Sequence, residues 1–138
     1  MNRAVFFILC LLFVGFSSQA KDKIKCNPGG AQLEMNACAY DRFVKADKEL
    51  NQTYKALLQK EDNNKIFIQK LRVAQKAWLA FRDAELEAMY ACEGADSRNC
   101  WGSMHPLCYS SYKEKLTQDR TKRLKELFEQ GPPADACE

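Results

Sequence analysis

The chain has 138 residues and a formal net charge of +3, with 21 basic and 18 acidic side chains interspersed along it. This length suits one domain, and the mixed charges exclude the basic patch that is typical of nucleic-acid-binding proteins. The single histidine, His105, cannot be assigned to a set with a serine or cysteine nucleophile, so we expect that the protein is not an enzyme.

The first twenty residues have the pattern of a cleaved secretory signal. Arg3 supplies the positive start, residues 4–16 form an apolar run, and Ser18-Gln19-Ala20 resembles a cleavage site. The run is short for a membrane span, and Cys10 does not follow the small residues of a lipoprotein signal. We therefore expect a bacterial protein of the periplasm or exterior, with residues 21–138 as one mature domain and no stable membrane anchor. The alternative is a retained anchor helix.

Cysteines are frequent in the mature part of the chain. Of the seven in the sequence, Cys10 belongs to the signal and six remain. An even count in an exported protein favours disulfides, and the spacing does not choose among the many pairings. The candidates are Cys26, Cys38, Cys92, Cys100, Cys108 and Cys137.

An amphipathic helix is predicted over residues 31–60, after the helix breaker Pro28-Gly29-Gly30. Its apolar positions recur at steps of three or four. They are Leu33, Ala37, Tyr40, Val44, Leu50, Tyr54 and Leu57. Asp47 interrupts this stripe, and a buried carboxylate needs an ionic or hydrogen-bonding partner. Residues 61–64 are polar and form a predicted loop.

A second helix is predicted over residues 65–91, and the fold is expected to assemble around it. Its expected inner face consists of Leu71, Ala74, Trp78, Phe81, Glu85 and Met89. Trp78 is the largest apolar side chain of that face, and Arg82 lies at its margin. Such a face requires partner helices.

A third helix is predicted over residues 107–130, before the helix-ending sequence Gly131-Pro132-Pro133. Its stripe consists of Tyr109, Tyr112, Leu116, Arg120, Leu124 and Leu127. No segment shows the alternation of a strand. The sequence therefore predicts an all-α protein, an antiparallel three-helix arrangement with disulfides.

Polar residues of all three helices are expected to meet at one height of the bundle. Counting outward from the loops places Asp47 level with Trp78, so its carboxylate is expected to accept hydrogen bonds from Arg120 or Arg82. The other members of this predicted polar layer are Asn51, Gln75 and Thr117. We expect the layer to fix helix register, because no base or nucleophile accompanies it.

The irregular segment 92–106 is the candidate binding element. Cysteines frame it, and a restrained loop loses less entropy on binding. Arginine and tryptophan are enriched at binding hot spots, and this segment contains both. The expected target-binding residues are Arg98, Trp101, Ser103 and His105. The alternative for Trp101 is that it packs under the loop and caps the bundle.

The same segment contains residue types that bind zinc. The potential ligands are Cys92, Cys100, His105 and Cys108. Their spacing does not match a common zinc finger, and an oxidising compartment favours disulfides. We therefore predict neither a metal nor another cofactor.

Several short segments, in order over nearly all of the mature chain, carry a resemblance to a known family. They are residues 32–38, Ala46-Asp47, Leu50-Asn51, Tyr54, Ala74-Gln75, Ala77-Trp78, Phe81-Arg82-Asp83, Gly102-Ser103, Pro106, Leu116-Thr117, Arg120 and Leu124. Together they resemble the LprI-type lysozyme inhibitor domain, a family of small, exported, mostly helical proteins. The resemblance implies a binding protein that occludes the cleft of lysozyme or a related peptidoglycan-cleaving enzyme. The alternatives are an immunity protein that neutralises a periplasm-delivered toxin, and an envelope structural or stress module.

The resemblance also implies disulfides. Cys26 and Cys38 match the N-terminal cysteine positions of the family and are expected to pair. A further cysteine pair of many relatives is absent here, and Cys92 with Cys108 is expected to replace it. The remaining two are Cys100 and Cys137. A helix about 35 Å long would separate them. Either that helix is shorter or bent, or the pairing of Cys92 with Cys108 is not the right one, or Cys137 bonds elsewhere.

Overall fold

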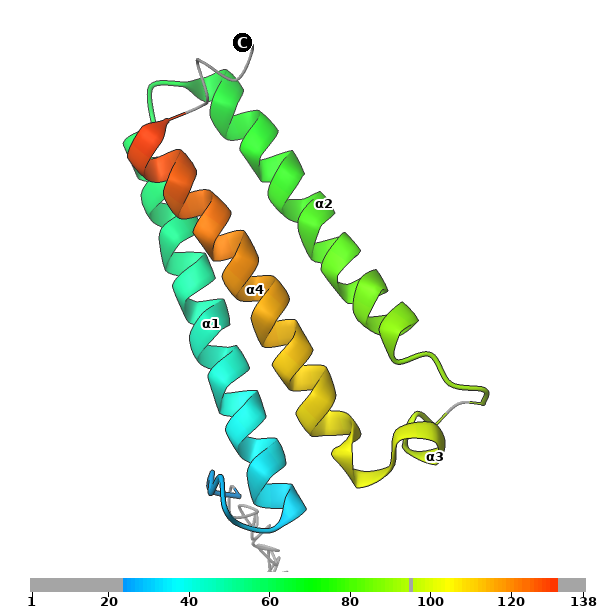
Figure 1. Cartoon of the computed structure of the whole chain (residues 1–138). Coiled ribbons are helices and arrows are strands. Elements are labelled where there is room, and N and C mark those ends of the chain that lie inside the picture. Colours follow the sequence, from blue (N-terminus) through cyan, green and yellow to red (C-terminus); the bar gives the residue numbers. More distant parts are fainter. Residues whose placement is uncertain (1–23, 95, 132–138) are drawn as a thin grey trace, which may run out of the picture.

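The computed structural model describes residues 24–94 and 96–131, and every regular element in those ranges is a helix (Figure 1). The long helices are α1 (Gln32–Lys60), α2 (Lys65–Met89) and α4 (His105–Gln130). The short helix α3 (Arg98–Trp101) and the 3-10 turn η1 (Gly102–Met104) lie between α2 and α4. The predicted all-α three-helix fold is confirmed, and the predicted boundaries lie within about two residues of the observed ones.

The ends of the long helices follow from local sequence. The Glu34 carboxylate accepts a hydrogen bond from the Ala31 N–H at 2.8 Å, at the positive end of the α1 dipole. The Asn64 side chain caps α2 by accepting from the Phe67 N–H at 3.1 Å. Gly131 ends α4 with a φ of 78°, in the left-handed region that favours glycine. Each of these residues therefore fixes where a helix begins or ends.

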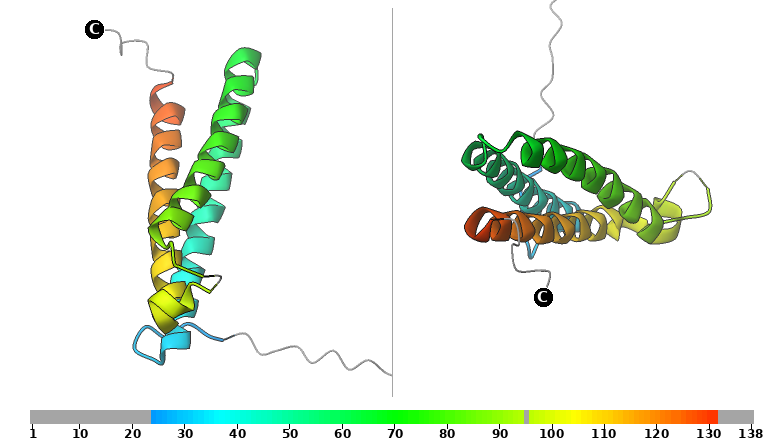
Figure 2. Two further views of the ribbon diagram at one scale, coloured as in Figure 1. Left: turned by 90° about the vertical axis from the view of Figure 1, so that its right-hand side faces the viewer. Right: turned by 90° about the horizontal axis from the view of Figure 1, so that it is seen from above.

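α1 and α4 run in the same direction and pack side by side, while α2 runs in the opposite direction (Figures 1 and 2). The α2 backbone approaches this pair less closely than α1 and α4 approach each other. α2 begins at the 61–64 turn beside the C-terminus of α1 and ends near the start of α4, where Tyr90 contacts Tyr109. α2 therefore crosses the α1–α4 pair.

The apolar core lies toward the end of the bundle that contains the 61–64 turn. Its buried members are Leu50, Leu57, Leu71 and Leu124, and Tyr54, Leu58, Phe67, Trp78 and Leu127 pack against them. The apolar residues predicted to face the core from α1 do so in the C-terminal half of the helix but not in its N-terminal half. Leu33, Tyr40 and Val44 are 62%, 53% and 44% exposed. They are exposed because α2 does not cover the N-terminal half of α1.

The inner face of α2 also differs from the predicted one. The buried side chains of α2 are Leu71, Gln75, Arg82 and Leu86. Trp78 is partly buried, as expected, but Phe81 and Met89 are 61% and 55% exposed and Ala74 is exposed too. The prediction assumed that apolar side chains mark the inner face, whereas α2 buries two polar side chains that bond to its neighbours.

Two disulfides form among the described cysteines. Cys26 pairs with Cys38, as the family resemblance implied. The expected pairing of Cys92 with Cys108 is wrong, because Cys92 is bonded to Cys100, with Cα atoms 5.9 Å apart. The short helix α3 turns Cys100 back toward the end of α2, and Cys108 keeps a free, partly buried thiol on α4. The expected partner role of Cys137 lies outside the described residues.

The predicted signal at residues 1–20 also lies outside the described part of the chain. Within residues 24–94 and 96–131, no helix combines the length and the apolar character needed to cross a bilayer.

Candidate target-binding site

The segment that joins α2 to α4 forms one end of the molecule, where α3 stands beside the start of α4 (Figure 1). The Cys92–Cys100 disulfide closes its first part, and Trp101 follows the bridge directly. On the other side, the main-chain oxygen of Ser103 accepts a hydrogen bond from the Asn36 side chain at 3.2 Å, which joins η1 to α1. Because both parts are restrained, little conformational entropy remains to be lost on binding.

Arg98 extends into solvent, but its guanidinium already holds a carboxylate. Its Nε donates to Oδ1 of Asp96 at 3.0 Å, and its Nη2 donates to Oδ2 at 2.8 Å. These hydrogen bonds from Arg98 lower the pKa of the Asp96 carboxyl below its ordinary value. The pair has no net charge, so Arg98 attracts a target carboxylate less strongly than an unpaired arginine would.

Four rings gather where the loop meets the bundle. The Tyr90 ring lies at their centre, and its centroid is 5.3 Å from that of Trp101, 5.4 Å from that of His105 and 5.6 Å from that of Tyr109. Trp101 is held edge to face by Tyr90, yet the residue remains 43% exposed. It is therefore anchored on one side and accessible on the other, which suits a rigid contact residue.

His105 is partly buried and contacts the rings of Tyr90 and Tyr109. Burial raises the pKa of both tyrosines, so their hydroxyls remain protonated at neutral pH. Sequence reasoning missed Tyr90 as a site residue. Its position between the predicted inner face of the second helix and Cys92 could have indicated that it lies where the loop joins the bundle.

A hollow of about 320 Å³ lies beside this ring cluster, between α1 and the start of α4. It is lined by Tyr40, Phe43, His105, Pro106, Tyr109, Ser110 and Lys113. The Lys113 ammonium lies 4.9 Å from the Phe43 ring centroid, within cation–π range. The hollow therefore offers aromatic walls and one cation, and it shares His105 and Tyr109 with the ring cluster. It was not predicted, because Tyr40 and Tyr109 were assigned to the bundle core.

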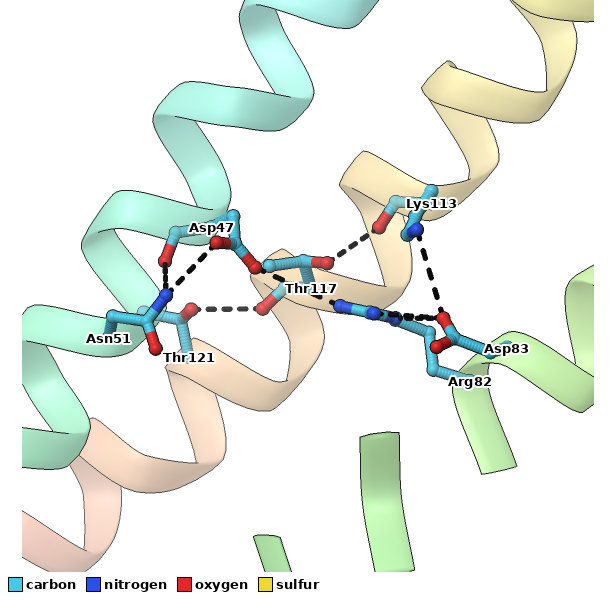
Figure 3. Close-up of polar contacts among 7 residues, drawn as sticks. All are labelled: Asp47, Asn51, Arg82, Asp83, Lys113, Thr117 and Thr121. Carbon is cyan, nitrogen blue, oxygen red and sulfur yellow. Dashed lines mark hydrogen bonds and ion pairs between the residues drawn. The ribbon is translucent and has the colours of Figure 1, made fainter. Parts of the chain in front are cut away.

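Asp47, Asn51 and Arg82 of the predicted polar layer lie together at mid-height (Figure 3). Nη1 of Arg82 lies 3.8 Å from Oδ1 of Asp47, and Asn51 donates to Oδ2 of Asp47 at 3.0 Å. The closer partner of Arg82 is its neighbour Asp83, at 2.9 Å from Nε and 2.8 Å from Nη2. The guanidinium also lies 5.2 Å from the Trp78 ring centroid. Nη1 of Arg82 is buried and has no hydrogen-bond acceptor.

Arg120 has a different partner from the one expected. Its Nε donates to Oε1 of Gln75 at 3.0 Å, and burial lowers the pKa of its guanidinium. The Thr117 hydroxyl is turned to its own helix and donates to the main-chain oxygen of Lys113 at 2.7 Å. A further contact between α4 and α2 was not predicted: the Tyr112 hydroxyl donates to Glu85 at 2.7 Å. The layer thus consists of separate contacts, and three of them join α2 to its neighbours: Gln75 with Arg120, Glu85 with Tyr112, and Arg82 with Asp47.

Within residues 24–94 and 96–131, no three histidine, cysteine or acidic side chains are grouped so that they could hold a metal ion. Cys92 and Cys100 are bonded to each other and cannot serve as thiolate ligands. What the site presents is an exposed indole, a paired arginine and an aromatic hollow.

Comparison with known proteins shows to which family the chain belongs. A family model described as "Lysozyme inhibitor LprI" matches residues 25–124, a range that includes α1, α2, the disulfide-closed loop and most of α4. An uncharacterised protein of Rhizobium meliloti (strain 1021) is 35% identical over 115 residues, which cover 75% of this chain and 78% of that protein. No solved structure was found to match. The chain therefore belongs to the LprI lysozyme inhibitor family.

Proposed function

We propose that this protein acts outside the cytoplasm and inhibits a lysozyme or a related peptidoglycan-cleaving enzyme by inserting its loop end into the cleft of that enzyme. The description of the family supports the class of target. The observation that carries the mode of action is the accessible Trp101 ring, held by Tyr90 next to a disulfide-closed loop. A rigid aromatic side chain buries a large area at a low entropic cost.

The surroundings of Trp101 fit a cleft that contains two carboxylates. Arg98 stands three residues before Trp101 and can share its guanidinium between Asp96 and a carboxylate of the enzyme. Ser103 and His105 follow on the bundle side. The net charge of +3 gives little long-range steering toward a charged enzyme, so short-range contacts carry the affinity and salt has a small effect on it. The protein contributes contacts and no reaction of its own.

The direct test is a titration of the oxidised, signal-free protein against a panel of lysozymes, with cell-wall lysis as the readout. We expect inhibition at micromolar or lower concentration. Trp101→Ala is expected to weaken it by about tenfold or more, the usual size of a hot-spot effect. Phe128→Ala is the matched control, because Phe128 is also an exposed aromatic residue (37%) but lies in the last turn of α4, at the opposite end of the bundle.

Circular dichroism must show that both variants keep their helices. Absence of inhibition by the unaltered protein across the panel would contradict the proposed function and would direct attention to periplasm-delivered toxins as targets. Equal inhibition by Trp101→Ala and the unaltered protein would place the contact elsewhere on the molecule.

A further inference from the structure

The outer side of α2, opposite its buried face, carries a mostly apolar row that Lys70 interrupts in its N-terminal half. The large members of this row are Ile66, Val73 and Phe81, which are 74%, 63% and 61% exposed. Between and after them, at the same helical spacing, stand exposed alanines at positions 77, 80, 84 and 88. This set is called the outer row of α2. A surface helix normally places charged residues on its outer side, so the outer row of α2 is an apolar surface that nothing in the described chain covers.

A line of charged residues runs along one edge of the outer row. Lys65, Arg72 and Lys76 occupy its N-terminal half, and Asp83 and Glu87 occupy its C-terminal half. None of the three basic residues forms an ion pair within the described part of the chain. Asp83 already pairs with Arg82 and, at 3.8 Å, with Lys113, but its side chain is half exposed and keeps a second carboxylate oxygen. The edge is therefore basic at one end and acidic at the other.

This order of charges is unfavourable for an isolated helix. A helix N-terminus carries partial positive charge and a C-terminus partial negative charge. The first turn of α2 nevertheless has no acidic residue, and its last turn has no basic residue. An antiparallel partner helix with the same sequence would place acidic side chains beside the basic half and basic side chains beside the acidic half. The charge pattern of α2 is thus complementary to itself in one orientation only.

We propose that the outer row of α2 is the interface of a homodimer in which two copies of α2 pack antiparallel. In antiparallel helix pairs the same edge of each helix meets across the interface. Arg72 then faces Glu87 of the second copy, and Lys76 faces Asp83 of the second copy. Both pairs are symmetric about one point, next to Ala80, as a twofold axis requires. The small alanines around that point let the two backbones approach closely.

The area available predicts a weak dimer. α2 has 25 residues and is therefore about 37 Å long, so two such helices bury only a narrow strip. This strip falls at the small end of specific interfaces, below about 1,200 Å². We expect a dissociation constant in the micromolar range and a dimer that weakens at high salt, because the edge pairs are exposed.

Analytical ultracentrifugation of the oxidised, signal-free protein over a wide range of concentrations tests the dimer. Val73→Glu buries an unpaired charge in the interface and is expected to weaken dimerisation by more than about tenfold. Val44→Glu is the matched control, because Val44 is an exposed valine (44%) of α1 and lies off the interface. Arg72→Glu and Glu87→Arg are each expected to weaken the dimer several-fold, and the double variant is expected to restore it.

Restoration by the double variant is the decisive result, since a folding defect in either single variant cannot produce it. The proposal is overturned by a monomer at every concentration, by Val44→Glu acting as strongly as Val73→Glu, or by a double variant as weak as the singles. A non-reducing gel must show no covalent dimer, because a bridge through Cys108 would account for dimers without α2. The outcome is independent of the lysozyme titration, which measures the loop end.

Discussion

Replacing Arg82 by methionine is expected to leave the free energy of unfolding nearly unchanged. The Arg82 side chain is 7% exposed, and its Nη1 has no acceptor, which costs about 1–3 kcal/mol. Its ion pairs with Asp83 and Asp47 and its contact with the Trp78 ring offset this cost, because exposed ion pairs contribute about 0–1 kcal/mol and a cation–π contact about 0.5–2 kcal/mol. Methionine keeps an unbranched apolar chain near Trp78 while removing both the unpaired donor and the ion pair.

The two effects nearly cancel, so we expect Arg82→Met to change stability by less than about 1 kcal/mol. Arg82→Ala removes the packing near Trp78 as well and is expected to cost about 2–4 kcal/mol. A change of 1 kcal/mol shifts the Tm of a domain of about 100 residues by about 4–8 °C. Urea or thermal unfolding followed by circular dichroism therefore separates the two variants.

Gln75→Met is the matched control, since Gln75 is also a buried polar residue of α2. Its Oε1 accepts from Arg120, so this change leaves the half-buried Arg120 without its partner and is expected to destabilise by about 1–3 kcal/mol. The reasoning fails if Arg82→Met destabilises as much as Arg82→Ala. The ionic contacts of Arg82 would then outweigh the cost of its unpaired donor.

Three further predictions follow from contacts at the loop end and between α4 and α2. Tyr112→Phe removes a 2.7 Å hydrogen bond and is expected to lower the urea midpoint of unfolding; an unchanged midpoint would contradict this. That bond to Glu85 raises the pKa of Tyr112, so its contribution is complete below pH 10.0 and is lost as the pH rises through the folded-state pKa. The Asp96–Arg98 pair is present above the ordinary Asp96 pKa of 3.8 and is lost as the pH falls through the lowered value; an NMR titration should give a midpoint below 3.8 that Arg98→Ala raises. Replacing both cysteines of the loop disulfide by serine should cost up to about 3 kcal/mol and weaken inhibition while the bundle keeps its helicity; full inhibition would show that the closed loop is not needed.

Helical periodicity and turn residues predicted the fold class and the helix boundaries, because both depend on local sequence. The predicted inner face of α2 was wrong because burial on this helix depends on its tertiary contacts. The stripe that was counted includes Phe81 and Met89, both exposed, whereas the buried positions include Gln75 and Arg82. A count of apolar residues cannot recognise an inner face that includes polar side chains, such as Gln75 with its hydrogen bond to Arg120 and Arg82 with its ion pair to Asp47.

Only those parts of the candidate site that are adjacent in sequence were predicted. The loop, its cysteines and Trp101 are adjacent in sequence, so their grouping could be predicted. The ring cluster and the hollow join residues from three helices, such as Tyr40, Tyr90 and Tyr109, whose approach depends on how α2 crosses the α1–α4 pair. The bridge from Cys92 to Cys100 depends on the one-turn helix α3. A helix this short has no periodic sequence pattern from which it could be predicted.

α2 buries polar side chains on its inner side and exposes apolar ones on its outer side. This unusual distribution connects the fold to both proposals. Inside, a hydrogen bond between Gln75 and Arg120 and an ion pair between Arg82 and Asp47 join α2 to the α1–α4 pair, and rings gather at the loop end. Outside, Val73 and Phe81 remain in water, where each loses the stabilisation of about 1.5–3 kcal/mol that full burial provides. In the proposed dimer a second copy would recover part of that stabilisation. Because the proposed copies pack antiparallel, their Trp101 rings would lie at opposite ends of the dimer, so each could enter the cleft of a separate enzyme, as the proposed function requires, without blocking the other.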